Sequence, residues 1–339
     1  MSGKYGKLLR GLCDLLLWAA LSTASLLLMK LVAPARRGFF CGDESLSYPL
    51  KDSTIGTITV IVVTLSVPSL VIAAVELFKQ PPAKEAARRS DYGCATRLGQ
   101  LYKQAGCYLF GLAMVTFCTV FTKLCIGRLR PHFFAVCQPA MEDGSSCADA
   151  HNLGQYITSY SCRNTNATSF QQHQLNQSFP SGHASMIMYA MWYVAIYLQA
   201  TLSTRVSKLL KHLLQFLFVM FGWYVALSRI TDYWHHWSDV LAGVLLGVLF
   251  AWLTAVHIAD LFAFRRWTRS GYSAHTLKRG QVSPKSSTKS QSQSQSTAAA
   301  AGGVPPALPA YTFGTLPYTA AYPAQAQYAQ TYHNYGYVP

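Results

Sequence analysis

The chain has 339 residues, of which 51% are hydrophobic and only 12% are charged, about half the charged share of an ordinary soluble protein. Lys and Arg number 28 against 13 Asp and Glu, and the net charge of +15 suits either nucleic acid or an anionic membrane surface as a partner. This length and apolar content exclude a chain that is disordered throughout, and nine Cys are too few for a small disulfide scaffold.

Six apolar runs are long enough to cross a membrane, since roughly 30 Å of hydrocarbon takes about 20 helical residues. They lie at about 12–33, 55–78, 104–126, 184–203, 213–229 and 239–261. A single run would suit a buried helix of a soluble protein, but six predict an all-α bundle of six transmembrane helices within residues 1–265. The first run lacks a clear small-residue cleavage site, so we expect an uncleaved span and not a signal peptide.

Basic residues are unevenly distributed between the segments that connect these runs. Nineteen of the 28 lie before the first run, between the second and third, between the fourth and fifth, or after the sixth. Lys and Arg near span ends accumulate on the cytoplasmic side. Both termini are therefore predicted to be cytoplasmic, and nucleic acid is no longer an expected partner. The outer loops are then 34–54, 127–183 and 230–238.

The predicted outer loops carry residues typical of a non-cytoplasmic compartment. Asn166-Ala167-Thr168 is a glycosylation sequon in the longest loop. Asn176-Gln177-Ser178 is a second, which we expect to be too close to the membrane for modification. Four Cys also lie in these loops, and three disulfide connectivities are open to them. They are Cys41, Cys137, Cys147 and Cys162.

The composition changes at about Gly271 to Ser, Gln, Ala, Pro and Tyr, with a repeated Ser-Gln tract at 290–295. A packed core cannot form from this composition. Residues 271–339 are therefore predicted to be a disordered cytoplasmic tail.

Three groups of polar residues fall at the predicted outer boundary, where charged side chains are costly and commonly functional. Lys123 lies seven residues before Arg130, close to two helical turns, so both cations would project from one side if the helix continues. For Lys123 alone, snorkelling toward the headgroups is the simpler interpretation.

The second group, Pro180-Ser181-Gly182-His183, opens the fourth run, and free N–H groups at a helix start attract anions. An ordinary helix cap is the simpler interpretation there, but Gly182 would let the backbone approach a ligand closely.

The third group is Ser228-Arg229, His235 and Asp239. His235 and Asp239 are four residues apart, so one helical face would hold the carboxylate against a ring nitrogen and leave the other nitrogen free to attack. For this pair alone, a surface histidine with a capping aspartate is an equally simple interpretation. His236 would lie about 100° further round a helix, so we place it outside the site.

Together the three groups offer complementary chemistry. The cations are Lys123, Arg130 and Arg229. Three cations are enough to hold a phosphate dianion and the charge that spreads over its oxygens during transfer. His235 is then the predicted nucleophile and His183 the proton donor to the leaving alkoxide. Asp239 is the only carboxylate in these groups, which leaves no acidic cluster for magnesium. We therefore expect phosphoryl transfer through a phosphohistidine, with no metal and no cofactor.

The order and spacing of these motifs resemble those of the type-2 phosphatidic acid phosphatases. The flanking residues 126–133 and 238–243 are similar to those of the animal lipid phosphate phosphatases. The likeness covers about residues 8–265, and no motif position departs from the family pattern. It implies a six-span membrane ectoenzyme, expected at the plasma membrane, that dephosphorylates phosphatidate, lysophosphatidate, sphingosine 1-phosphate and ceramide 1-phosphate.

Carried over by position, the resemblance implies a role for each motif residue. Those that would bind the phosphate are Lys123, Arg130, Ser181, Gly182 and Arg229. His183 would be the acid, His235 the nucleophile and Asp239 its orienting partner. The family also implies a dimer or a larger homo-oligomer.

Three other functions fit parts of the sequence. An inactive relative with a scaffold role would show losses in the motifs, and none is seen. A lipid phosphotransferase similar to the sphingomyelin synthases would use two histidines and an aspartate, but the three cations favour a phosphatase. A transporter would place its charges near the bilayer midplane and show internal repeats, whereas here the motif charges lie at one boundary.

Overall fold

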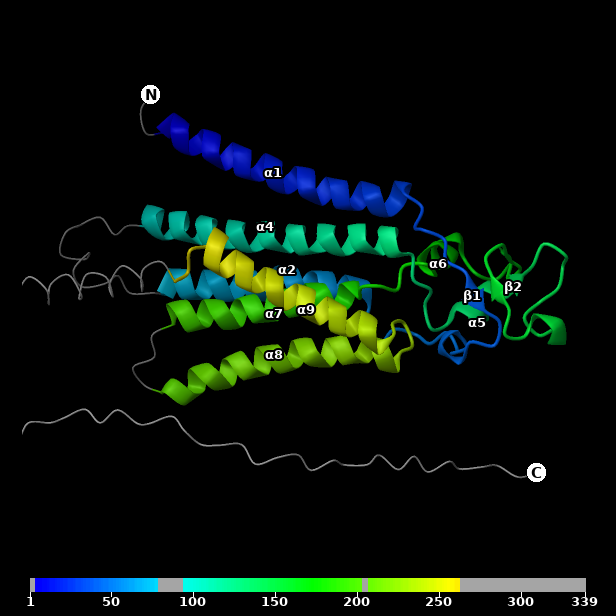
Figure 1. Ribbon diagram of the computed structural model, residues 1–339. Coiled ribbons are helices and arrows are strands. Elements are labelled where there is room, and N and C mark those ends of the chain that lie inside the picture. The colour runs from blue at the N-terminus through cyan, green and yellow to red at the C-terminus, as the bar shows by residue number, and fades with distance from the viewer. Residues whose placement is uncertain (1–3, 79–93, 203–206, 263–339) are drawn as a thin grey trace, which may run out of the picture. The chain divides into compact units, whose positions relative to one another are not determined.

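The computed structural model describes residues 4–78, 94–202 and 207–262. The predicted tail, 271–339, lies outside the described residues. The long helices are α1 (Lys4–Leu31), α2 (Thr57–Phe78), α4 (Cys94–Ile126), α7 (Gly182–Thr201), α8 (Lys208–Thr231) and α9 (Trp237–Leu253). A π-helical turn, η3 (Thr254–Ile258), continues α9. These helices form one bundle (Figure 1), so the all-α fold predicted from the apolar runs is confirmed.

Five of the described helices are long and apolar enough to cross a membrane. Their apolar segments are Leu9–Leu31, Thr57–Phe78, Arg97–Ile126, Leu209–Thr231 and Trp237–Ile258. The remaining long helix, α7, contains serines and tyrosines that contact other helices. The Ser185 hydroxyl lies 2.9 Å from that of Thr119 on α4, and the Tyr197 hydroxyl donates to Glu76 on α2 at 2.7 Å. A helix enclosed by protein can hold such polar groups because it does not face lipid.

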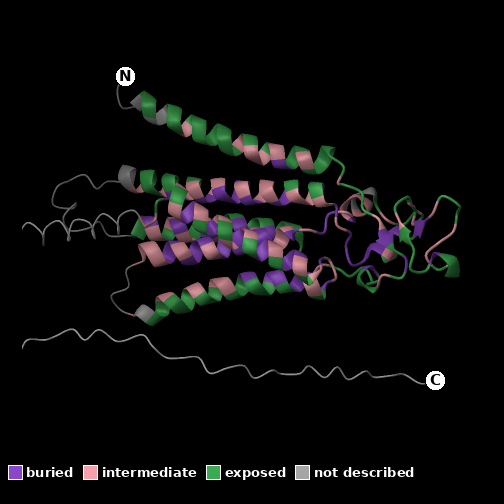
Figure 2. Cartoon of the chain, viewed as in Figure 1, coloured by how far each residue is buried: buried purple, intermediate pink, exposed green. Residues whose placement is uncertain are grey.

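α7 is the central helix of the bundle. It packs against α2, α4, α8 and α9, and Figure 2 shows buried residues concentrated along it. Two glycines on α9 allow the backbones of α7 and α9 to lie close together. A Cβ at Gly243 would lie 2.6 Å from the carbonyl oxygen of Ser181, and one at Gly247 would lie 2.5 Å from that of Ser185. Residues without side chains let two helix backbones approach closely. This contact fixes the start of α7 against the start of α9.

α1 lies at the edge of the bundle, where it packs principally on α4. Only 6% of its apolar span is buried within the protein. Leucines along its whole length are exposed, as expected of a helix whose neighbours are lipid chains.

The segments that follow α1 and α4 pack together at one end of the bundle, which we call the loop end (Figure 1). Strand β1 (Phe39–Phe40) pairs with β3 (Tyr156–Ile157), and β2 (Pro139–Ala140) pairs with β4 (Ser161–Cys162), both antiparallel. The short helices here are η1 (Glu44–Leu46), α5 (Phe133–Cys137), η2 (Ala150–Asn152) and α6 (Ser169–Gln174). Disulfides join Cys41 to Cys147 and Cys137 to Cys162, which selects one of the three open connectivities.

Candidate active site

The three sequence motifs meet at the loop end of the bundle. Lys123 is in the last turn of α4, Ser181 caps the start of α7, Arg229 is in the last turn of α8, and Asp239 is in the first turn of α9. Four helix ends therefore bring together residues that are far apart in the sequence (Figure 1).

Lys123 and Arg130 lie beside the segment that precedes α7. Lys123 Nζ donates to the carbonyl oxygen of Gln177 at 2.5 Å. A Cβ at Gly182 would lie 3.8 Å from Lys123 Cε, so the lysine runs along the glycine of the second motif. Arg130 Nε donates to the carbonyl oxygen of Gln174 at 2.9 Å, and its Nη2 donates to the side chain of the same residue at 3.2 Å. Both cations are therefore held at the start of α7.

Arg130 also packs on an aromatic ring, and it remains charged at neutral pH. Its guanidinium carbon lies 5.0 Å from the ring centroid of Trp234, within the range of a cation–π contact. Burial lowers the pKa of Arg130, and with the opposing effects of Asp239, which raises it, and Arg229, which lowers it, the pKa is about 10. Since this value is above 7, Arg130 offers a positive charge to an anion.

Arg229 is almost completely buried and already has a carboxylate partner. Its Nη2 donates to Asp232 at 2.8 Å, and its Nη1 donates to the hydroxyl of Ser53 at 2.6 Å. Asp232 in turn accepts from the backbone N–H and the hydroxyl of Thr54, at 2.8 and 2.7 Å. The segment before α2 thus fixes the third cation. Asp232 is not among the predicted site residues, although its i, i+3 spacing from Arg229 is one that pairs side chains on a helix.

The start of α7 combines an anion-attracting helix end with an imidazole. Ser181 caps the helix by accepting from the N–H of Ala184 at 3.4 Å, and the first N–H groups of a helix carry partial positive charge. His183 Nε2 is buried and has no hydrogen-bond partner among the described residues. The charges of Arg229, Arg130 and Lys123 all act on this ring, which places His183 close to the three cations.

His235 is held in one tautomer by a backbone contact. Its Nδ1 lies 2.7 Å from the carbonyl oxygen of Ser178. A carbonyl oxygen only accepts hydrogen bonds, so Nδ1 carries the proton and Nε2 keeps a free lone pair. Burial lowers the pKa of His235 well below its ordinary value of 6.5, and the nearby charges of Arg130 and Lys123 lower it further. The imidazole is therefore neutral at neutral pH, as a nucleophile requires.

Asp239 lies near His235 but is not hydrogen-bonded to it. The distance from Asp239 Oδ2 to His235 Nδ1 is 3.9 Å. The expected i, i+4 proximity is present, but α9 begins at Trp237, so His235 belongs to the preceding turn and not to the same helical face. Asp239 Oδ2 instead accepts from the hydroxyl of Ser178 at 2.6 Å. Asp239 therefore contacts the residue whose carbonyl group holds the imidazole.

Two further residues bind the Asp239 carboxylate. Arg128 Nη1 lies 2.5 Å from Oδ1. His236 was expected to lie outside the site, but it caps α9: its backbone N–H donates to Asp239 Oδ2 at 3.0 Å and its ring Nδ1 lies 3.2 Å from the same oxygen. Arg128 is not among the predicted site residues, although it stands two residues before Arg130. The prediction for His236 was wrong because the chain turns at this residue and α9 begins only at Trp237.

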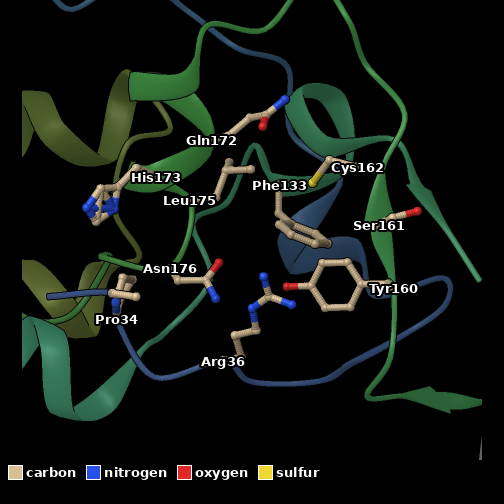
Figure 3. Close-up of a pocket in the computed structure, with 11 residues that line it drawn as sticks. Pro34, Arg36, Phe133, Tyr160, Ser161, Cys162, Gln172, His173, Leu175 and Asn176 are labelled. Atoms are coloured by element: carbon tan, nitrogen blue, oxygen red, sulfur yellow. The ribbon is translucent and has the colours of Figure 1, made fainter. Parts of the chain in front are cut away.

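A cavity of about 530 Å³ lies beside the site (Figure 3). Its lining includes Arg36, Tyr160, His173 and Asn176, and the guanidinium group of Arg36 points toward the hydroxyl of Tyr160. Residues 172, 173, 175 and 176 line this cavity, whereas Gln174, Gln177 and Ser178 contact the motif residues. The segment before α7 therefore contributes both to the lining of the cavity and to the contacts of the motif residues, and Leu175 does both, since its carbonyl oxygen accepts from the N–H of Arg130 at 2.9 Å.

Comparisons with known proteins identify the family of the chain. The model of the PAP2 superfamily matches residues 104–262, which include all three motifs. A Drosophila melanogaster protein named "Putative phosphatidate phosphatase" is 42% identical over 280 residues, 80% of this chain and 73% of its own length. Human phospholipid phosphatase 2 is 38% identical over 272 residues, 80% of this chain and 88% of its own length. The comparison with solved structures found no match. The chain therefore belongs to the type-2 phosphatidic acid phosphatase superfamily, in its animal lipid phosphate phosphatase branch, and is an integral membrane lipid phosphatase.

Proposed function

We propose that this phosphatase hydrolyses phosphatidate, lysophosphatidate, sphingosine 1-phosphate and ceramide 1-phosphate through a phosphohistidine at His235. The observation that carries the proposal is the Nδ1 contact of His235 with the carbonyl oxygen of Ser178, at 2.7 Å. This contact leaves Nε2 free for attack, and burial keeps the ring neutral by lowering its pKa.

The remaining motif residues have complementary roles in this proposal. The groups that hold the phosphate are Lys123, Arg130, Arg229, Ser181 and the backbone of Gly182. They stabilise the charge that spreads over the phosphoryl oxygens during transfer. The bound dianion offsets the three cations, which lets His183 hold the proton that it donates to the leaving alkoxide. Nε2 of His235 forms the bond to phosphorus as the ester bond breaks, and water then hydrolyses the phosphohistidine.

The proposal includes a location and an orientation. Six spans would place both termini in the cytoplasm and the loop end outside, because the basic residues accumulate in the opposite segments. The enzyme would lie in the plasma membrane, with lipid phosphates as substrates and Asn166 as a glycosylation site. The reaction would need no metal, because three cations already neutralise the phosphate. A homo-oligomer is part of the same proposal.

Phosphate release tests this function. The purified protein in detergent should release inorganic phosphate from each of the four lipids in excess chelator, and His235→Ala should abolish release. A phosphohistidine should be trapped from ³²P-labelled phosphatidate, acid-labile and absent in His235→Ala. Full activity of His235→Ala would refute the nucleophile, and complete loss of wild-type activity with chelator would refute the metal-free mechanism.

Intact cells test the orientation. Externally added lysophosphatidate should be hydrolysed, and peptide N-glycosidase should increase the mobility of the wild-type protein but not of Asn166→Gln. In an Asn166→Cys variant, the new cysteine should react with a membrane-impermeant thiol reagent on intact cells. Reaction only after the cells are permeabilised would contradict the proposed topology.

A further inference from the structure

Ser178 contacts three parts of the candidate site at once. Its hydroxyl donates to Asp239 Oδ2 at 2.6 Å, and its carbonyl oxygen accepts from His235 Nδ1 at 2.7 Å. Its backbone N–H donates to the carbonyl oxygen of Arg128 at 3.0 Å. The residue is completely buried, so water cannot replace any of these contacts. Ser178 lies outside the three motifs, three residues before Ser181.

These contacts make Ser178 the connection between Asp239 and His235. The direct distance between the carboxylate and the imidazole, 3.9 Å, is too long for a hydrogen bond. The path through Ser178 consists of two short contacts instead. Asp239 fixes the hydroxyl, and the backbone of the same residue fixes the ring. A displacement of Ser178 would therefore move the acceptor that selects the tautomer of His235.

The fixed partners of Asp239 support this role. Oδ1 is bound by Arg128 at 2.5 Å, and Oδ2 is shared by the hydroxyl of Ser178 and the capping contacts of His236. The carboxylate is completely buried and sits in the first turn of a long helix, so its position is well defined. A hydrogen bond to such a charged, buried group is among the stronger ones in a protein.

We propose that Ser178 is a positioning residue, which transmits the fixed position of Asp239 to the imidazole of His235 and so keeps Nε2 free for attack on phosphate. This inference rests on the proposed phosphohistidine mechanism. It adds a residue that touches neither phosphate nor alkoxide. It also gives Asp239 an indirect effect on the nucleophile in place of a hydrogen bond to it.

The test is Ser178→Ala in the full-length protein, with dioctanoyl phosphatidate in detergent. The change removes the hydroxyl and keeps the carbonyl group. Loss of a hydrogen bond to a charged group predicts a fall in kcat of about tenfold to 100-fold. KM and the inhibition constant of inorganic phosphate should stay within about twofold, because Ser178 does not bind phosphate. Ser178→Thr keeps the hydroxyl and should recover most of the kcat.

Two control variants separate this role from general damage. Ser185→Ala deletes another completely buried serine hydroxyl, whose partners are Thr119 and the carbonyl oxygen of Gly182, and it should keep the wild-type kcat. Asn176→Gln removes the same sequon that Ser178→Ala removes, but leaves the hydroxyl in place. An unchanged kcat in Asn176→Gln excludes a glycan effect.

Combining substitutions distinguishes positioning from a structural role. If Ser178 acts through Asp239, then Ser178→Ala should have little further effect in an Asp239→Asn background, because coupled residues are not additive. Fully additive effects, or a wild-type kcat in Ser178→Ala, would overturn the inference. If Ser178→Ala does not yield folded protein, Ser178→Cys supplies a weaker donor, and a wild-type kcat there would also overturn it. A different result would refute the proposed function itself: full activity of His235→Ala.

Discussion

Asp232 ties one of the proposed phosphate-binding cations to the segment before α2, and its removal has a predictable cost. Its carboxylate accepts from Arg229 Nη2 at 2.8 Å and from the N–H and hydroxyl of Thr54 at 2.8 and 2.7 Å. The side chains of Arg229 and Asp232 are 2% and 1% exposed. Asp232→Ala would therefore leave a buried guanidinium without a counter-charge and a backbone N–H without an acceptor.

Breaking a buried ion pair from one side costs about 3–5 kcal/mol. Arg229 would keep its hydrogen bonds to Ser53 and Ser228, at 2.6 and 3.0 Å, so we expect the lower end, about 3 kcal/mol. Since about 1.4 kcal/mol is a factor of ten, the folding equilibrium should shift by more than about 100-fold. For a chain of 339 residues the melting temperature should fall by roughly 4–6 °C.

Thermal unfolding in detergent, monitored by tryptophan fluorescence, measures this effect. The matched control is Asp143→Ala. Asp143 is exposed, and among the described residues its carboxylate accepts only from Ser145, so its loss should cost less than about 0.5 kcal/mol. Asp232→Ala should also raise KM at a temperature where it remains folded, because Arg229 is no longer held in place. Equal melting temperatures for the two variants would refute the reasoning.

Two other predictions concern pH and helix packing. Burial and the charge of Arg130 lower the pKa of His235, so the wild type should keep a neutral nucleophile below pH 6.5. Arg130→Gln removes one of the charges that lower this pKa, so the acid limb of the pH profile of kcat/KM should move to higher pH. The substrate titrates in the same way with the wild type and the variant. An acid limb that does not move would therefore contradict the assignment of this limb to His235. Gly243→Ala should abolish most activity, because the new Cβ would lie 2.6 Å from the carbonyl oxygen of Ser181. Gly99→Ala, with open space around it, should leave phosphate release unchanged, and equal activity of the two variants would exclude the packing explanation.

Hydropathy predicted the helices and the last residues of α2 and α4, Phe78 and Ile126, but several other helix ends differ from the prediction. The first apolar run was placed at 12–33, whereas α1 is Lys4–Leu31, and the fifth was placed at 213–229, whereas α8 is Lys208–Thr231. Apolar runs measure the part of a helix that lies in hydrocarbon, while the backbone hydrogen bonds continue into polar flanks. The start of α7 was predicted closely because Pro180-Ser181 is a local capping signal, independent of any tertiary contact.

Contacts between distant segments could not be predicted in this way. The disulfide connectivity depends on how β1 meets β3 and how β2 meets β4, and each of these strands has only two residues. So short a strand leaves no alternating pattern in the sequence. Asp232 was missed for a related reason: its partner Thr54 is 178 positions away, in a segment that carries no motif.

The spacing of the motifs identified hydrogen-bond donors, but the acceptors that fix those donors are mostly backbone carbonyl groups. Lys123, Arg130 and His235 each donate to a carbonyl oxygen between Gln174 and Ser178. Every residue has a carbonyl group, so the residue type does not indicate which carbonyl groups point toward a site. The i, i+4 spacing predicted Asp239 as a side-chain acceptor for His235. In the structure that acceptor holds Ser178, and the carbonyl group of Ser178 selects the tautomer. An aspartate four residues after a histidine therefore indicates proximity, while the hydrogen bond that directs the imidazole depends on how the preceding segment folds.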